Sequence, residues 1–316
     1  MTQQKQLGQT ISDDVVEVED HSRRRGLASV MGRIRPGHLL LVVVALLWLI
    51  PTVGLLVTSF RTRAASSQSG WWTALWNGGW TVDNYGTVLG TEGGLPPPGF
   101  TPSFINTIII TVPSTIIPIA IAALAAFGIV WVGFRGRNFI YLGVIALLII
   151  PLQVTWTPVL QLFNWIGANT PLSLTGEFYG LVIAHTAYGL PFAVFLLVGA
   201  FAQVPKDLVE AARIDGASNW QIFSRILLPL TTPVIAALAI FQFVWVWNDL
   251  MNALIFLQDV NKFPLTVAIR NLLGQYGNEW HLLAAGAFVS MVVPLVVFFS
   301  LQRYFVRGLT AGAVKG

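Results

Sequence analysis

Six long apolar stretches dominate the sequence and restrict what this chain can fold into. They cover roughly residues 39–60, 104–132, 139–160, 179–201, 229–257 and 281–302. A helix needs about 20 mostly apolar residues to span a bilayer, and each stretch reaches that length. Only 10% of the 316 residues are charged, whereas an ordinary soluble domain has about 25%. The sequence therefore predicts an all-α, polytopic membrane protein with six transmembrane helices.

The apolar stretches divide the chain into segments of different character. Residues 1–35 are polar and predict a disordered tail, and residues 36–60 predict the first transmembrane helix. An outer loop is expected over 61–103, followed by a five-helix core over 104–302 and a tail over 303–316. A polar segment at 203–228 interrupts this core. The tryptophans of the outer loop suit a membrane interface, and contact with a ligand or partner is the alternative.

The lysines and arginines fall mainly on one side of this arrangement. Of the 18, only Arg61, Arg63, Lys262 and Arg270 lie in segments that are outside when the N-terminus is inside. Cytoplasmic segments carry the excess of Lys and Arg, so both termini and segment 203–228 are predicted to be cytoplasmic. The basic balance thus indicates membrane orientation and predicts no nucleic-acid partner.

Segment 203–228 has the pattern of a helix, a sharp turn and a second helix. Pro205 suits the first position of a helix, in which Leu208, Ala211 and Ala212 are spaced to share one apolar face. A glycine at 216 permits a left-handed turn. Ser218, with a glutamine three residues later, has the capping-box pattern that begins a helix.

The same segment resembles the EAA loop of ABC importer permeases. That family has Glu-Ala-Ala, three residues, Gly, nine residues, Ile, any residue and Leu-Pro, and this chain matches at every position. The resemblance implies the transmembrane domain of a type I importer, a second homologous permease subunit and two ATPase subunits that grip this coupling helix in a bacterial inner membrane. It assigns ATPase coupling to Glu210, Ala211, Ala212, Asp215, Gly216 and Ala217.

Two further regions are similar to carbohydrate permeases of the maltose type. Trp247-Asn248-Asp249 and the C-terminal tail match that subfamily, in which the tail of the second permease inserts between the ATPase subunits. The resemblance implies import of a disaccharide or oligosaccharide, with an extracytoplasmic sugar-binding protein as a further partner. The tail residues assigned to the ATPase interface are Gly308, Leu309, Thr310, Gly312, Lys315 and Gly316.

The chain lacks the motifs of a catalytic or nucleotide-binding protein. There is no G-x-x-x-x-G-K-[ST] loop, no His-Glu-x-x-His pattern and no cysteine. We therefore expect a transport subunit without catalytic residues, metal or cofactor of its own. ATP and Mg²⁺ are expected on the partner ATPase.

Polar residues within the spans are candidates for the translocation path. They are His185, Tyr188, Gln242 and Asn248. A bond to a neighbouring helix is the alternative for His185. Asp249 lies near the outer end of its span and need not be buried.

Two other functions remain open at this point. One is a stand-alone, ion-coupled secondary carrier, which needs ionisable residues deep in the spans. The other is an ABC permease for a different solute, such as a phosphate ester or a polyamine.

Overall fold

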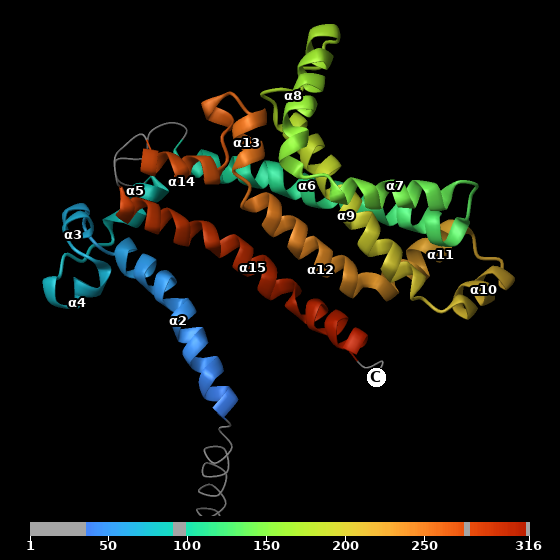
Figure 1. Cartoon of the computed structure of the whole chain (residues 1–316), viewed down its shortest axis with the longest axis horizontal. Helices are drawn as coiled ribbons and strands as arrows, with labels where there is room; N and C mark the ends of the chain where they lie inside the picture. Colours follow the sequence, from blue (N-terminus) through green and yellow to red (C-terminus); the bar gives the residue numbers. More distant parts are fainter. Residues whose placement is uncertain (1–35, 91–98, 275–278, 314–316) are drawn as a thin grey trace, which may run out of the picture. The chain divides into compact units, whose positions relative to one another are not determined.

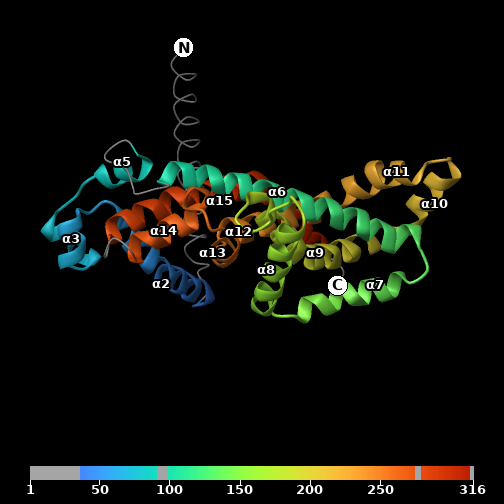
Figure 2. The same cartoon turned by 90° about the horizontal axis from the view of Figure 1, so that it is seen from above.

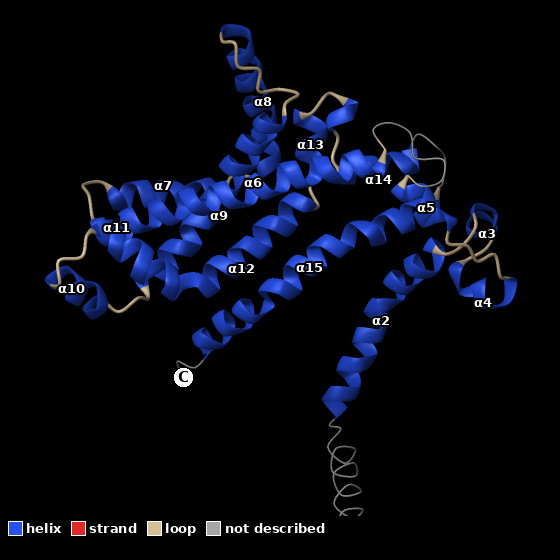
Figure 3. Cartoon of the chain, turned by 180° about the vertical axis from the view of Figure 1, so that it is seen from behind, coloured by secondary structure: helices blue, strands red, loops and turns tan. Residues whose placement is uncertain are grey.

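The computed structural model describes residues 36–90, 99–274 and 279–313. In these ranges the regular structure is helical (Figure 3), and the one β-type pairing is an isolated bridge between Arg61 and Trp80. The predicted N-terminal tail lies outside the described residues. The chain divides into two compact units, residues 1–55 and residues 56–316.

Helix α2 (Pro36–Ser59) makes up the described part of the first unit. Its last residues, from Leu56, belong to the second unit. Residues 37–59 are long and apolar enough to cross a membrane, as predicted for the first span.

The second unit is a series of helices joined by short connections (Figures 1 and 2). They are α3 (Arg63–Gln68), η1 (Trp71–Thr73), α4 (Ala74–Asn77), α5 (Asp83–Leu89), α6 (Phe100–Phe127), η2 (Gly128–Val132), α7 (Arg137–Ile149), α8 (Leu152–Asn169), α9 (Phe178–Ala202), α10 (Lys206–Ile214), α11 (Asn219–Ile222), η3 (Phe223–Leu227), α12 (Leu228–Trp247), α13 (Met251–Phe256), η4 (Val260–Lys262), α14 (Leu265–Gly274) and α15 (Trp280–Ala313).

Helix α6 runs through three hydrophobic clusters of this unit. Phe100, at its start, packs with α5, α14 and α15, and Ile110 packs with α8, α9 and α13. Ala122 and Ala126 then join α9, α10 and α12 in a third cluster. Figure 1 accordingly shows α5 near one end of α6 and α10 with α11 near the other.

Five helical segments of the described chain are each long and apolar enough to cross a membrane, and a bent pair makes a sixth only if its two helices form one span. That pair occupies the predicted span 139–160, where α7 and α8 meet at 106°. Ile150 has an extended backbone (φ −73°, ψ 120°) because a residue that precedes proline disfavours the helical region. Pro151 therefore ends one helix and begins the next.

Two other predicted boundaries differ in the structure. The stretch 229–257 is interrupted, since α12 ends at Trp247 and α13 begins at Met251. At the C-terminus, α15 continues as a helix as far as Ala313, through most of the predicted tail.

A proline inside α6 creates a polar contact between α6 and α12. Pro118 has no N–H, so the carbonyl of Ser114, four residues earlier, loses its helical donor. The Gln242 side chain of α12 donates to that carbonyl, with an Nε2–O distance of 3.0 Å. A neighbouring helix thus satisfies the freed backbone group, as a lipid environment requires.

The start of α9 allows a direct test of packing. A Cβ at buried Gly180 would collide with the backbone carbonyl of Leu174, whereas a Cβ at Gly143 of α7 meets nothing within 4 Å. We expect Gly180→Ala to destabilise the protein by about 1–3 kcal/mol through overpacking. Gly143→Ala should be neutral or better. Thermal unfolding of both variants in detergent tests this, and equal midpoints would contradict the close approach.

Candidate coupling hairpin and translocation pocket

The segment from Pro205 to Leu227 forms a hairpin whose turn follows the predicted chemistry. Gly216 has φ +81°, the left-handed conformation that glycine adopts without strain. The Ser218 hydroxyl accepts from the N–H of Gln221 at 3.3 Å, and the Gln221 side chain accepts from the N–H of Ser218 at 2.7 Å. The predicted capping box is therefore confirmed.

The inner face of the hairpin belongs to the core of the spans. Val209, Ile222, Phe223 and Leu227 are buried in one cluster with residues of α6, α9 and α12. Leu208 and Ala211, which were predicted to share one apolar face of α10 with Ala212, are exposed, and Val209 is the buried residue of this helix. At 3.6 residues per turn, Val209 and Ala212 share a face, and Leu208 turns away from it.

The opposite face of the hairpin is open. Glu210, Ala211 and Ile214 are exposed along α10, and Ile214 is 86% exposed. Asp215 and Gly216 are exposed at the tip. Of the six predicted coupling residues, only Ala212 and Ala217 pack against the core, and both are half-buried.

Two side-chain bonds fasten the hairpin region to the spans. Arg213 of α10 donates from Nη2 to the carbonyl of Trp131 at 2.9 Å, near the end of the α6 and η2 helix. Trp131 donates from Nε1 to the carbonyl of Phe201 in α9 at 3.2 Å. Carbonyls at a helix C-terminus lack helical partners and attract cations, which explains the position of Arg213.

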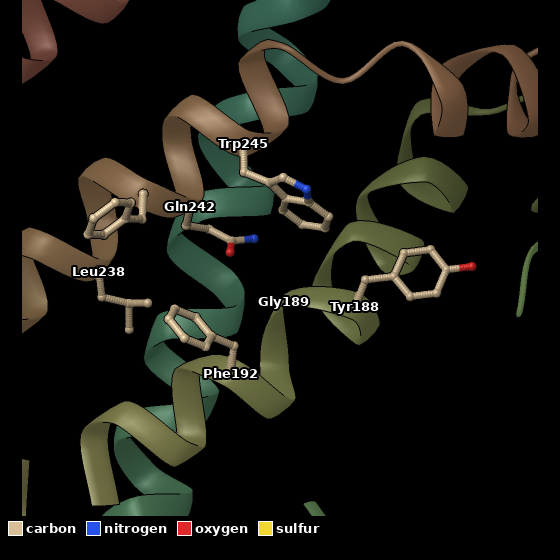
Figure 4. A pocket seen from close by; sticks show the side chains of 7 residues that line it. Tyr188, Gly189, Phe192, Leu238, Gln242 and Trp245 are labelled. Atoms are coloured by element: carbon tan, nitrogen blue, oxygen red, sulfur yellow. The ribbon is translucent and has the colours of Figure 1, made fainter. Parts of the chain in front are cut away.

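A second candidate site lies between α9 and α12. Tyr188, Gly189 and Phe192 of α9, with Leu238, Phe241, Gln242 and Trp245 of α12, line a cavity of about 330 Å³. Figure 4 shows Gln242 and Trp245 projecting from α12 toward the helix that carries Phe192 and Tyr188. The lining is mostly aromatic and aliphatic, with the Gln242 amide as a fixed polar group.

Gly189 lets the Gln242 amide take this position. A Cβ at residue 189 would come within 2.5 Å of Nε2 and 2.8 Å of Oε1 of Gln242. The amide therefore occupies the space that any other residue would fill. It reaches from α12 across to α6 because α9 has no side chain at this point.

The other two predicted path residues do not line this cavity. His185 is 1% exposed and lies with its Nε2 3.5 Å from Oδ2 of Asp249 and its ring edge-on to Trp245. Asn248 is exposed and donates to the carbonyl of Val244 in its own helix at 2.8 Å. Of the four residues, the structure brings only Tyr188 and Gln242 together.

Asp249 is more enclosed than expected for a residue at the outer end of a span. Its carboxylate accepts from the N–H of Ala253 at 3.2 Å and from the side chain of Asn252 at 3.0 Å. Asn252 in turn accepts from Nε1 of Trp156 in α8 at 2.9 Å. His185 and Asp249 thus join α9 to the break between α12 and α13, which supports a bond to a neighbouring helix as the role of His185.

Sequence reasoning missed the aromatic residues of the cavity, Phe192, Phe241 and Trp245. The sequence does carry a signal for this cavity, because four of its lining residues are spaced to share one face of a helix. They are Leu238, Phe241, Gln242 and Trp245. In an apolar span this spacing does not stand out, because nearly every residue is hydrophobic.

Two predicted features are less fully described. Of the tail residues assigned to the ATPase interface, Gly308, Leu309, Thr310 and Gly312 lie on the last turns of α15. The remaining two, Lys315 and Gly316, lie outside the described residues. In the described part of the chain, no group of three or more His, Cys, Asp or Glu side chains is placed to hold a metal ion.

The chain is similar to known proteins in both sequence and fold. Residues 118–311 match the family model of the binding-protein-dependent transport system inner membrane component. Osmoprotective compounds uptake permease protein GgtD of Synechocystis sp. is 45% identical over 285 residues, which cover 89% of this chain and 92% of that protein. Alpha-glucoside transport system permease protein AglG of Rhizobium meliloti is 45% identical over 83% of this chain and 67% of its own length.

A solved structure shows the same fold. A chain of a bacterial ABC transporter involved in the import of the acidic polysaccharide alginate aligns with a TM-score of 0.70 and 22% identity, over 90% of this chain and 98% of that chain. The matched region includes the hairpin, the cavity and the spans that connect them. The chain therefore belongs to the family of binding-protein-dependent transport system inner membrane components, the permeases of ABC importers.

Proposed function

We propose that this chain forms half of the translocation pathway of an ATP-driven importer of disaccharides or oligosaccharides. A second homologous permease forms the other half, and two ATPase subunits, which carry ATP and Mg²⁺, bind the hairpins. A soluble sugar-binding protein delivers the solute at the opposite face. Both termini and the hairpin lie in the cytoplasm, on the side of the ATPases.

The two-faced hairpin is the observation that carries this proposal. Its inner face is buried with three spanning helices, while Glu210 and Ile214 remain exposed on its outer face. A partner that moves the outer face therefore moves α6, α9 and α12 with it, because close-packed side chains transmit displacement. The exposed isoleucine suits a pocket on that partner, and Glu210 suits a basic group beside it.

The chemistry of the cavity supports a sugar as the solute. Its volume of about 330 Å³ lies within the usual range for small-molecule sites, about 300–1,000 Å³. Aromatic side chains offer flat apolar surfaces, and the Gln242 amide offers a donor and an acceptor to hydroxyl groups. The alpha-glucoside permease among the relatives favours the same solute class.

Reconstitution tests the function directly. The tagged full-length chain is purified from its native membrane with its bound subunits and placed in liposomes with the co-purified soluble binding protein. We expect uptake of a labelled disaccharide or oligosaccharide that requires ATP and the binding protein. Uptake by this chain alone in an ion gradient would contradict the proposal, and a phosphate ester or polyamine bound to the soluble protein would contradict the solute class.

The turn of the hairpin gives a sharper test of coupling. Within this chain no atom lies within 4 Å of a Cβ at Gly216, so substitution there acts on the hairpin itself only through the backbone energy. Valine at a positive φ costs about 1–3 kcal/mol, whereas asparagine tolerates this conformation. We expect Gly216→Val to lower solute-stimulated ATP hydrolysis and uptake together, and Gly216→Asn to retain most of both. Normal transport by the valine variant would remove the turn from the mechanism.

The cavity is tested by two glycines of α9. Gly189→Ala should push the Gln242 amide away from its position, whereas Gly199→Ala adds a methyl group where nothing lies within 4 Å. We expect Gly189→Ala to raise the solute concentration needed for half-maximal uptake, with little change in hairpin binding to the ATPase. Equal transport by the two variants would show that the cavity is not on the path.

A further inference from the structure

Residues 60–90, which we call the cap, form a small folded unit at the end of α6 opposite the hairpin. The N–H of Thr62 donates to the carbonyl of Gly79 at 2.8 Å, and the N–H of Thr81 donates to that of Phe60 at 2.8 Å. These bonds flank the bridge between Arg61 and Trp80. Helices α3 and α4 lie in the loop that the bridge closes.

A buried arginine fixes the shape of this loop. Arg61 is 1% exposed, and its guanidinium donates to the carbonyls of Ser69 at 2.9 Å and Ala65 at 2.7 Å and to the Ser69 hydroxyl at 2.6 Å. A buried charge is tolerated when hydrogen bonds satisfy it. The two terminal nitrogens of the guanidinium therefore hold the C-terminal end of α3, while its Nε has no hydrogen-bond partner there.

The cap is fastened at the ends of two spanning helices. Asn84 donates to the carbonyl of Ser59, the last residue of α2, at 2.8 Å and to that of Arg61 at 2.9 Å. Arg63 pairs with Glu279, one residue before α15, at 2.5 Å. Both contacts join the cap to the ends of helices that are long and apolar enough to cross a membrane.

Distance along the chain gives the depth of the bridge. Arg61 is two residues beyond the end of α2, and an extended chain advances about 3.3 Å per residue, so the bridge to Trp80 lies within about 7 Å of the span's end. The polar headgroup layer on each side of the hydrocarbon is about 5–8 Å thick. A hydrocarbon layer that ends with α2 would therefore place Trp80 at the level of the headgroups.

The part of the cap formed by η1 and α4 exposes large apolar side chains. Leu75 is 82% exposed and Trp76 is 80% exposed on α4, with Trp72 also exposed just before it. The sequence holds no charged residue between Arg63 and Asp83. Tryptophan is enriched at membrane interfaces, where an apolar ring meets polar headgroups.

We propose that the cap lies on the lipid bilayer, with Trp72, Leu75 and Trp76 inserted among the headgroups and upper acyl chains. The cap is fastened to two spans, and the same bilayer that surrounds these spans would contact the cap. The inserted side chains hold these spans at a fixed level while the hairpin at the other end moves. This inference does not depend on the solute or on the ATPase.

The absence of cysteine makes the proposal testable at single positions. Leu75→Cys and Trp76→Cys each carry one nitroxide label on the full-length chain in lipid nanodiscs. The matched control is Gln68→Cys, at an exposed polar position on α3 of the same cap. Paramagnetic resonance measures how far each label is accessible to oxygen, which concentrates in the bilayer, and to a water-soluble nickel chelate.

We expect the labels at 75 and 76 to lie about 5–10 Å deep in the region where headgroups meet acyl chains, which is the depth of interfacial helices. The label at 68 should remain in water. Equal access of the nickel chelate to all three labels would overturn the proposal. Shielding that appears only after the soluble binding protein is added would also overturn it, because the surface would then be a protein contact. Gel filtration of each labelled variant confirms folding before the measurement.

Discussion

Inside a bilayer, every backbone carbonyl that loses its helical donor must find another one, and this constraint accounts for much of the structure. Pro118 frees the carbonyl of Ser114, and Gln242 satisfies it. The end of the α6 and η2 helix leaves the carbonyl of Trp131 free, and Arg213 of the hairpin satisfies that one. The bilayer requirement thus places the polar group of the cavity, whereas a free carbonyl at an exposed helix end fastens the hairpin to the spans.

These bonds give the hairpin a defined connection to two spans. Arg213 binds the backbone at Trp131, and the indole of Trp131 binds the carbonyl of Phe201 at the end of α9. Around them, Val209 and Phe223 pack with Phe127 and Phe201 in one buried cluster. The hydrogen bonds set the direction of the contact, and the buried side chains make it stiff, so the hairpin and the ends of α6 and α9 are expected to move together.

The sequence predicted local features well where a single residue carries the signal. Gly216 and Ser218 determine the turn and the cap of the hairpin through their own backbone chemistry. The apolar stretches predicted helices because their length and composition are also properties of the local sequence. Features set by tertiary contact were harder to predict: the choice of Val209 over Leu208 depends on neighbouring spans, and the burial of Asp249 depends on α9 and α13. The bend at Pro151 had a local cause, but its angle of 106° depends on packing.

The position of the cavity relative to the hairpin follows from α9 and α12, which contribute to both. Gly189 and Phe192 line the cavity, and Leu197 and Phe201 of the same helix enter the cluster that holds the hairpin. At about 1.5 Å per residue, Gly189 and Phe201 are about 18 Å apart along the helix. Leu238 belongs to both sites, because it lines the cavity and is buried in the hairpin cluster. A shift of the hairpin therefore reaches the cavity through continuous packing, without a separate relay of polar residues.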